Sequence, residues 1–394
     1  MPHYRWLIIG AGMTGDSAVK GIREVDATSP IGLIGAEPSP PYNRPPLSKG
    51  LWKDQHLEQI WRDTPQVGVD LHLGCRVIQL DKTGKSVVDD RGTVFTFEKL
   101  LLATGGAPRH LPFDTTGNRI IYYRTVEDYR RLRALVGTGQ RFAVIGGGFI
   151  GSEIAAALTL NGKHVVMLFP EAGIGARVFP APLATMLNAY YREKGVEVLV
   201  GEVVTDLRMR GEQTILTTQG GREITADGVV AGVGIQPNDE LASAAGLPTD
   251  NGILVDELLR AGHPDIYAAG DVARFFNPAL GMRLRVEHED NANTMGHAAG
   301  RNMAGQAAPY HHLPFFYSDL FDLGYEAVGD LDSRLVTVED WKAPFREGVV
   351  YYLKDGRVRG VLLWNVWGQV DNARALIAQP GPFRPEDLTG RLPA

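Results

Sequence analysis

The feature that most constrains the fold of this chain is a glycine-rich signature that occurs twice. An apolar run at residues 6–9 leads into the first copy, and a run at residues 142–145 leads into the second. The glycines are Gly10, Gly12 and Gly15 in the first copy and Gly146, Gly148 and Gly151 in the second. Each G-x-G-x-x-G follows a predicted strand and precedes a predicted helix, a context that raises the motif above chance. Such glycines permit a tight bend, close approach of a pyrophosphate and close helix packing, so we expect two dinucleotide sites.

An acidic residue follows each turn at the spacing that suits a ribose hydroxyl, about 20 residues on. These residues are Glu37 and Glu171, each at the end of a predicted strand. Two sites in one chain suggest one tightly held cofactor and one exchanging partner, which we assign as FAD for the first and NAD(P)H for the second. The predicted strand that ends at Thr104 and Gly105 supports this order. So does the strand before Asp271, whose carboxylate suits a ribityl hydroxyl.

The order of these segments predicts an α/β protein in which two Rossmann-like domains are interleaved. We expect a discontinuous FAD-binding domain at residues 1–118 and 253–313, with an NAD(P)H-binding domain at residues 119–252 inserted between its parts. From residue 314 the composition changes, and a C-terminal α+β domain is expected at residues 314–394. Its predicted strands and closing helix cover residues 315–317, 349–353, 358–364 and 371–377.

Composition restricts the partners and the redox chemistry. The net charge of −6 gives no reason to expect nucleic-acid binding, which needs a basic face. The single cysteine, Cys75, lies in an alternating apolar stretch, so we expect it to be buried, and it cannot supply the dithiol of a disulfide reductase. The sequence has no metal-ligand spacing, and no apolar run approaches the ~18 residues of a membrane span. Strand-like sequence from Tyr4 onward leaves no room for a leader, so we expect a cytosolic protein.

Several motifs resemble those of a known group of flavoproteins. The stretch PYNRPPLSK at residues 41–49, both glycine-rich turns and the ending AAGD at residues 268–271 are similar to the ferredoxin-reductase-like flavoproteins. Within that group the chain resembles the apoptosis-inducing-factor-like oxidoreductases, from the first predicted strand to the last predicted helix. The closer likeness lies in GGFIGSE (147–153), LFPEAG (168–173), RVEHED (285–290), FYSD (316–319), GYEAVG (324–329) and LWN (363–365). The resemblance implies the same split two-Rossmann fold, with FAD and NADH as cofactors.

On the flavin side the resemblance implies a set of contacts centred on Lys49. This lysine would lie near the reactive edge of the flavin, paired with Glu153, and its charge would stabilise the anion of the reduced flavin. Phe149 would cover the flavin where the nicotinamide must stack, and it would move when NADH binds. The backbone of Val77 would hold the adenine. The other matching positions on this side are Arg44, Arg124, Asp271, Glu287, His288 and Tyr317, the last standing where the animal proteins have tryptophan.

The resemblance also implies the contacts of the nicotinamide nucleotide. They are Ile150, Glu171, Arg177, Glu287, His288, Glu326 and Asn365. The neighbours of His288 along the chain are Glu287, Glu289 and Asp290, so we expect its protonated form to be favoured. Glu171 favours NADH because its carboxylate would repel a 2′-phosphate, whereas Arg177 keeps NADPH open as the alternative donor. The residues expected to carry catalysis are Lys49, Glu153, Phe149 and His288.

The expected reaction transfers hydride from NADH to bound FAD and then passes electrons to an acceptor that the sequence leaves open. One alternative is a reductase that feeds a small acidic electron carrier, a ferredoxin or rubredoxin, of an oxygenase system. Arg283 and Arg285 are candidate docking residues for such a carrier. Another alternative is a redox-responsive interaction module, in which the reduced, NAD-bound form changes shape or dimerises. The expected oligomeric state is a monomer or a homodimer.

Overall fold

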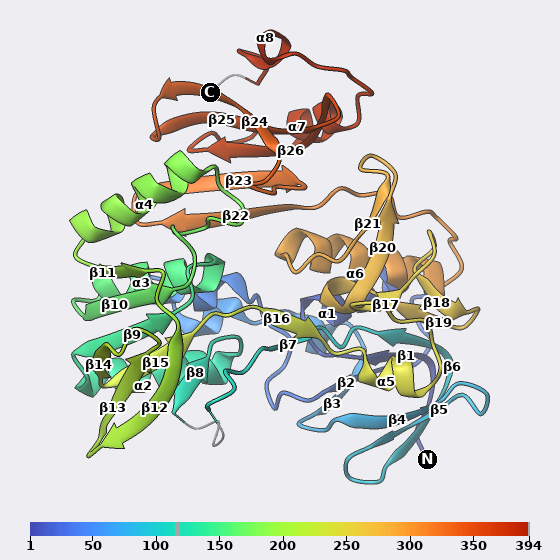
Figure 1. Ribbon diagram of the computed structural model, residues 1–394. Coiled ribbons are helices and arrows are strands. Elements are labelled where there is room, and N and C mark those ends of the chain that lie inside the picture. The colour runs from blue at the N-terminus through green and yellow to red at the C-terminus, as the bar shows by residue number, and fades with distance from the viewer. Residues whose placement is uncertain (115–118, 393–394) are drawn as a thin grey trace. The chain divides into compact units, whose positions relative to one another are not determined.

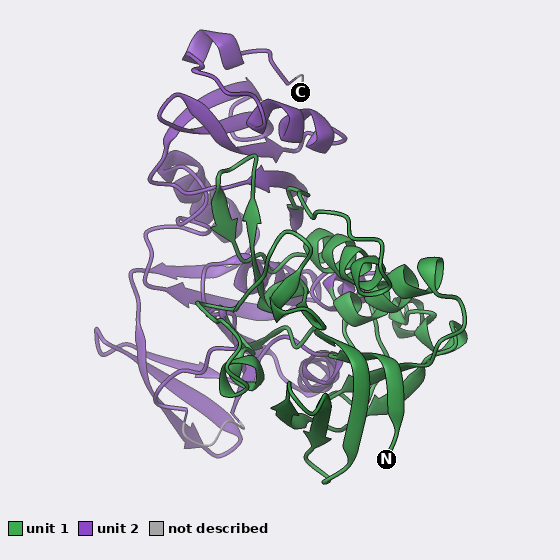
Figure 2. Cartoon of the chain, turned by 90° about the vertical axis from the view of Figure 1, so that its right-hand side faces the viewer, with its two compact units in different colours: residues 1–44, 56–107, 236–315 green, residues 45–55, 108–235, 316–394 purple. Residues whose placement is uncertain are grey.

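The chain forms two compact units, each discontinuous in sequence. The computed structural model describes residues 1–114 and 119–392. The units hold residues 1–44, 56–107 and 236–315 in the first and residues 45–55, 108–235 and 316–394 in the second (Figure 2). The expected domain boundary after residue 118 lies outside the described residues, and the three-domain division stays a prediction. Strands β7 (Gly106–Pro108) and β16 (Ile235–Pro237) lie at points where the chain passes between the units.

The core of the first unit is an eight-stranded, mainly parallel sheet (Figure 1). Its strands are β1 (His3–Ile9), β2 (Ile31–Gly35), β3 (Asp70–Leu73), β4 (Val77–Asp81), β5 (Ser86–Asp89), β6 (Val94–Leu102), β18 (Arg260–His263) and β19 (Ile266–Ala268). The order is β18-β19-β6-β1-β2-β3, and β4 and β5 join it through β6. Residues 6–9 of β1 are all buried, as expected for a strand between two parallel neighbours. The chain returns to this sheet at β19, which pairs in parallel with β6.

Two long helices, α1 (Met13–Val25) and α6 (Glu289–Met303), pack closely in the first unit. A β-carbon on Gly296 would lie 2.4 Å from the carbonyl oxygen of Thr14, and one on Gly300 would lie 2.1 Å from that of Ala18. Glycine is therefore required where the backbones meet. The remaining elements of this unit are β17 (Ile253–Leu254), β20 (Ala273–Asn277), β21 (Met282–Leu284), α5 (Glu240–Ala244) and the 3-10 turns η3 (Leu57–Ile60), η4 (Thr64–Gln66) and η5 (Gly270–Val272).

The second unit contains another parallel sheet. Its strands are β8 (Ile120–Tyr122), β9 (Arg141–Ile145), β10 (His164–Phe169), β11 (Glu197–Val200) and β15 (Gly228–Ala231), in the order β11-β10-β9-β15-β8. Helix α3 (Phe149–Leu160) follows β9 and buries its residues 151–158, so it is a core helix. The accompanying elements are α2 (Val126–Thr138), α4 (Ala181–Glu193), the antiparallel strands β12 (Val204–Arg210), β13 (Gln213–Thr218) and β14 (Glu223–Ala226), and the turns η1 (Pro45–Leu47) and η2 (Gly50–Trp52).

The C-terminal part of the second unit is a five-stranded antiparallel sheet. Its strands are β22 (Phe315–Leu320), β23 (Leu323–Gly329), β24 (Val336–Ala343), β25 (Glu347–Lys354) and β26 (Arg357–Trp364), followed by α7 (Val370–Ile377) and α8 (Pro385–Leu388). Tyr325 and Trp364 stack in its core with ring centroids 5.7 Å apart. The expected fold class, two Rossmann-like halves and a C-terminal α+β part, is confirmed.

Candidate active site

Both glycine-rich turns have the backbone geometry that the motif requires. Gly10 and Gly146 have φ values of +120° and +114°, which a residue with a side chain rarely adopts. A β-carbon on Gly15 would lie 2.1 Å from the carbonyl oxygen of Gly10. One on Gly151 would meet the oxygen of Gly146 at 2.0 Å. The first and last glycines of each turn are therefore fixed by sterics within the protein.

The middle glycines face open space. A β-carbon on Gly12 or Gly148 would find no described heavy atom within 4 Å. Helices α1 and α3 start immediately after these glycines, and no described side chain caps either helix. Their first N–H groups therefore point toward a space that an anion can fill. Each turn fits the pyrophosphate of a dinucleotide.

The first ribose acid, Glu37, is held by the loop that follows it. The Tyr42 hydroxyl donates to Oε2 of Glu37 at 2.6 Å, and Nη2 of Arg44 donates to Oε1 at 3.2 Å. The backbone N–H of Arg44 also contacts Sδ of Met13, the first residue of α1. The acid, the loop and the glycine-rich turn thus form one connected group in the first unit.

The second ribose acid, Glu171, is paired with the arginine that follows it. Nη2 of Arg177 lies 2.6 Å from Oε1 of Glu171. The arginine side chain is 84% exposed and the glutamate 25%. The two residues that were predicted to favour NADH and NADPH, respectively, therefore lie in contact with each other.

Lys49 and Glu153 form the expected ion pair. Nζ of Lys49 donates to Oε1 of Glu153 at 2.5 Å, and the side chains are 14% and 3% exposed. Two hydroxyls complete the cluster: Ser48 donates to Oε2 at 2.6 Å and Ser318 to Oε1 at 2.5 Å. Burial, together with the charge of Glu153, raises the pKa of Tyr325 well above its ordinary value. A buried carboxylate with three donors is an arrangement that can orient a cation.

Aromatic rings surround this cluster within the second unit. Nζ of Lys49 lies 5.2 Å from the ring centroid of Tyr317. Phe149 begins α3 one turn before Glu153, so the two residues share a helix face. The Phe149 ring lies 5.2 Å from that of Phe316. The structure therefore places Lys49 in contact with Glu153 and Tyr317, and Phe149 one helical turn before Glu153, while their roles toward the cofactors stay predictions.

His288 differs from the sequence expectation. It lies in the first unit at the N-cap of α6, and burial lowers its pKa from 6.5 to about 4. Asp271 and Asp290 attract the charged form but do not outweigh desolvation. The predicted protonated imidazole is wrong: His288 is neutral at neutral pH, and the carboxylates that act on it include Asp271, which is distant in sequence.

Two predicted flavin-side residues of the first unit, Asp271 and Glu287, are linked by Arg285. Its guanidinium donates to the carbonyl oxygen of Asp271 at 3.1 Å and lies 2.7 Å from Oε1 of Glu287. The side chain is only 11% exposed. Arg285 is therefore committed to internal contacts, whereas Arg283, the other candidate docking residue, is exposed.

Four predicted contact residues lie at or near the ends of chain segments. The Thr104 hydroxyl donates to the carbonyl oxygen of Asn238 at 2.7 Å, and the backbone N–H of Asn238 donates to the carbonyl oxygen of Gly105. These two hydrogen bonds join the segment after β6 to the segment after β16. Val77 begins β4 and is buried. Arg124 directly precedes Thr125, the N-cap of α2.

The C-terminal sheet brings further nucleotide-side residues into the second unit. Burial raises the pKa of Glu326, whose Oε2 has no hydrogen-bond partner among the described residues. Asn365 holds the backbone, accepting from the N–H of Gly324 at 2.7 Å. The loop after Glu171 packs on this sheet through Phe179, whose ring lies 5.2 Å from that of Tyr325. An unpartnered buried acceptor suits a ligand that donates a hydrogen bond.

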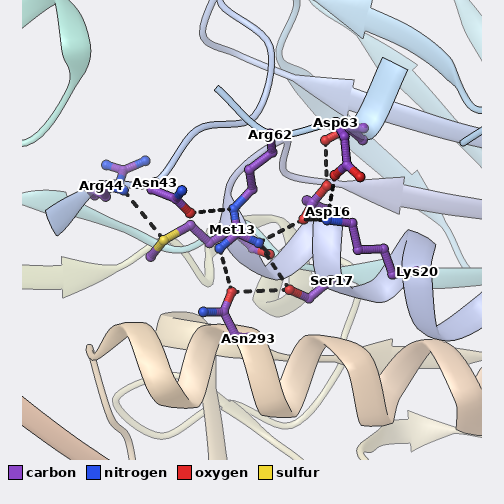
Figure 3. Close-up of polar contacts among 10 residues, drawn as sticks. Met13, Asp16, Ser17, Lys20, Asn43, Arg44, Arg62, Asp63 and Asn293 are labelled. Atoms are coloured by element: carbon purple, nitrogen blue, oxygen red, sulfur yellow. Dashed lines mark hydrogen bonds and ion pairs between the residues drawn. The ribbon is translucent and has the colours of Figure 1, made fainter. Parts of the chain in front are cut away.

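Sequence reasoning missed two groups. Ser48 and Ser318 were not singled out, although each lies within a motif of the resemblance. A polar network around Arg62 and Asp16 was also missed (Figure 3). The signal for it was an aspartate in the first helical turn after the glycine motif, a position that must be neutralised when buried.

No described helix combines the length and apolarity needed to cross a membrane. No set of three or more histidine, cysteine, aspartate or glutamate side chains among residues 1–114 and 119–392 is arranged to hold a metal ion.

Comparisons with known proteins agree with this geometry. Residues 4–296 match the model of the pyridine nucleotide-disulphide oxidoreductases, and residues 299–344 and 339–379 match the C-terminal domain of mitochondrion-associated apoptosis-inducing factor. The chain is 35% identical to apoptosis-inducing factor 1 of Dictyostelium discoideum, covering 95% of this chain and 78% of that one. It is 36% identical to the ferredoxin–NAD(+) reductase component of the anthranilate 1,2-dioxygenase system of Burkholderia cepacia, covering 97% and 96%. The solved covalent putidaredoxin reductase–putidaredoxin complex contains a chain of the same fold, with a TM-score of 0.90, 30% identity and coverage of 98% and 95%.

Proposed function

Because this chain belongs to the pyridine nucleotide-disulphide oxidoreductase family, we propose that the electrons it takes from NADH pass to a small ferredoxin-type carrier. The chain is an FAD-dependent NADH oxidoreductase. The observation that supports a protein acceptor is the lone Cys75, which is 4% exposed and cannot form the dithiol of an internal exit route. Two of the similar proteins named above are themselves reductases that work with such carriers.

The proposed roles follow from the two glycine-rich turns. FAD, when bound, accepts hydride from NADH and can release its electrons one at a time, so one NADH serves two one-electron carriers. The open space at Gly12 receives the FAD pyrophosphate and that at Gly148 the NADH pyrophosphate. Glu37 and Glu171 bind the ribose hydroxyls of the two nucleotides.

The cluster of Lys49, Glu153, Ser48 and Ser318 supplies the positive charge that the proposed reaction needs. Lys49 would place a cation beside the flavin edge, where it would stabilise negative charge, and Glu153 fixes the position of Nζ. Ser48 and Ser318 hold the carboxylate so that it cannot rotate away. Phe149 would cover the flavin face on which the nicotinamide stacks, and it would move aside when NADH binds. His288 serves as a neutral hydrogen-bonding group.

The test is an anaerobic titration with NADH followed by visible absorption. We expect bleaching of the oxidised flavin at one NADH per FAD, followed by fast reoxidation by an added ferredoxin. A panel of quinones, oxygen and ferredoxins then ranks the acceptors by kcat/KM. A protein that cannot be reconstituted with FAD would refute the flavin assignment. Reoxidation that is no faster with ferredoxins than with oxygen would refute the proposed acceptor alone.

The docking surface for the carrier includes Arg283. This residue is exposed, and only part of its guanidinium is engaged, through Nη1 with the carbonyl oxygens of Val255 and Arg274. Small ferredoxins are acidic, so Arg283→Glu should lower the rate of carrier reduction most strongly at low ionic strength. An unchanged salt dependence would exclude this surface.

A second candidate function is favoured by the match of residues 299–344 and 339–379 to the C-terminal domain of apoptosis-inducing factor. In this alternative the NADH-reduced form changes its interactions, and turnover is incidental. It predicts slow reoxidation by oxygen, a long-wavelength absorption band after NADH addition and a change in mass on reduction. Light scattering of the oxidised and reduced forms decides between the two candidates.

A further inference from the structure

One arginine of the first unit, Arg62, lies at the centre of a buried polar network (Figure 3). Its Nη1 donates to Oδ2 of Asp16 at 2.7 Å. Its Nε donates to Oδ1 of Asn43 at 2.9 Å, and its Nη2 donates to Oδ1 of Asn293 at 2.7 Å. The side chains of Arg62 and Asp16 are 11% and 0% exposed. The guanidinium therefore binds three separate segments with three different nitrogens.

Each of these segments also carries a predicted flavin contact. Asp16 lies in the first helical turn of α1, directly after Gly15, the last glycine of the first glycine-rich motif. Asn43 stands between Tyr42 and Arg44, both of which bind Glu37. Asn293 lies in α6, the helix that His288 caps. Arg62 is thus one point at which all three segments are joined through a single side chain.

The carboxylate of Asp16 has two further partners besides Arg62, and both of its oxygens are engaged. The Thr64 hydroxyl donates to its Oδ1 at 2.6 Å, and Nζ of Lys20 lies 3.2 Å from its Oδ2. Lys20 also lies 2.6 Å from Asp63, and these two carboxylates outweigh desolvation and raise the pKa of Lys20. A pocket of about 450 Å³ opens beside the network. Its lining is formed by Ser17, Lys20, Asn43, Trp61, Arg62, Asp63 and Asn293.

Chemistry explains why arginine is needed at this position. A buried carboxylate in the first turn of α1 would repel a pyrophosphate bound at the same helix end, unless a cation neutralises it. Only a planar guanidinium offers several N–H groups in fixed directions, whereas an ammonium is a point charge. A lysine could neutralise Asp16, but it could not hold Asn43 and Asn293 in the same geometry.

We propose that Arg62 is a positioning residue of the FAD site. It holds the start of α1, the loop at residues 41–44 and α6 in the arrangement that the cofactor needs, without touching the cofactor. The proposal rests on the flavin cofactor alone and not on the identity of the electron acceptor.

The experiment measures release of FAD from the holoenzyme, followed by the rise in fluorescence of free flavin after dilution. We expect Arg62→Met to raise the release rate on the order of tenfold, the scale of one lost charge-assisted hydrogen bond. Arg62→Lys should recover little of this loss. Asn293→Ala leaves every charge in place and removes the hydrogen bonds that link α6 to Arg62 and to Ser17, so it should raise the release rate by a smaller factor.

The matched control is Arg23→Met. Arg23 also belongs to the first unit and donates to the carbonyl oxygens of Val67 and Ser29 at the other end of α1. A merely structural role predicts that Arg62→Met and Arg23→Met lower the unfolding midpoint alike and leave FAD release unchanged. If Arg62→Met does not fold, Arg62→Lys and Asn293→Ala decide the question. The proposal is wrong if neither releases FAD faster than Arg23→Met.

Discussion

Glu153 is the most tightly held carboxylate of the candidate site. It is almost excluded from water and depends on Lys49 for its counter-charge. We therefore expect Lys49→Met to lower the free energy of unfolding by about 3 kcal/mol, because an uncompensated charge stays buried. Urea denaturation measures this loss. The control is Lys53→Met in the same loop, whose side chain is exposed and whose removal should cost almost nothing. Equal losses in the two variants would show that the ion pair is not buried in solution.

His288 leads to a prediction about pH. Its folded pKa of about 4 lies below the ordinary value of 6.5, so the unfolded chain takes up a proton before the folded chain does. The stability that this residue contributes is complete above about pH 6.5 and declines as the pH falls toward about 4. Urea denaturation along this range should show a steeper loss in the wild type than in His288→Gln. The control His164→Gln replaces an exposed histidine and should keep the wild-type slope.

We propose that the contact between Glu171 and Arg177 determines the nucleotide preference. Glu171→Ala removes the acceptor for the ribose hydroxyls and frees Arg177 for a 2′-phosphate. We expect the ratio of kcat/KM for NADH to that for NADPH to fall by about tenfold or more. Arg177→Ala should move the ratio in the opposite direction. If both variants keep the wild-type ratio, these two residues do not read the ribose.

At the scale of elements, the functions of the two glycine-rich turns can be tested separately by adding a single methyl group to each. Gly12→Ala and Gly148→Ala place a methyl in open space, so both proteins should fold. Gly12→Ala should lose FAD, whereas Gly148→Ala should keep FAD and bind NADH about tenfold more weakly. FAD absorbance per protein and NADH titration measure the two effects. Gly15→Ala is the contrasting variant, because its methyl would overlap the carbonyl oxygen of Gly10 and should prevent folding.

The pattern of the sequence predicted some elements better than others. Strands next to the glycine-rich turns were found because their apolar runs end at a recognisable motif. In the C-terminal sheet, β23 and β24 were not predicted. Strand β24 is half-exposed along its length and has no clear alternation, whereas β23 is buried on both faces and begins with a Leu-Gly pair. Neither has the period of two that identifies a strand with one buried face.

In the candidate site, too, some features were predicted from the sequence and others were not. Lys49 and Glu153 were paired correctly because each lies in a distinctive motif. The protonation of His288 was predicted wrongly because its neighbours along the chain are not the whole of its environment, and burial dominates. The network of Arg62 joins residues that lie far apart in sequence: Asp16 signalled that a buried cation was needed, but no local pattern showed that Arg62 supplies it.

For the whole molecule, the order of the motifs was the most informative signal. It predicted that the chain would leave the first sheet and return to it, and the parallel pairing of β19 with β6 confirms this return. No short-range pattern could predict the boundaries of the two compact units, because these boundaries depend on contacts between segments that are distant in sequence.

This organisation predicts how the molecule responds to loss of FAD. A ligand that binds only the folded state adds about 2.7 kcal/mol at one hundred times its Kd, and the segments that hold it gain the most protection. Removing FAD should therefore speed amide hydrogen exchange in α1 and α6. Strands β25 and β26 of the C-terminal sheet serve as the internal reference and should keep their protection. Mass spectrometry of the two forms measures this, and a uniform increase along the chain would contradict it.

Cys75 has a practical consequence that goes beyond the route of the electrons. It is the single cysteine of the chain and lies 4% exposed, and burial raises the pKa of its thiol. Such a thiol reacts slowly with maleimides and iodoacetamides. The native protein is therefore a nearly silent background for site-specific labelling. An exposed position such as Lys53, replaced as Lys53→Cys, would carry a nitroxide or a fluorophore without any prior removal of native thiols.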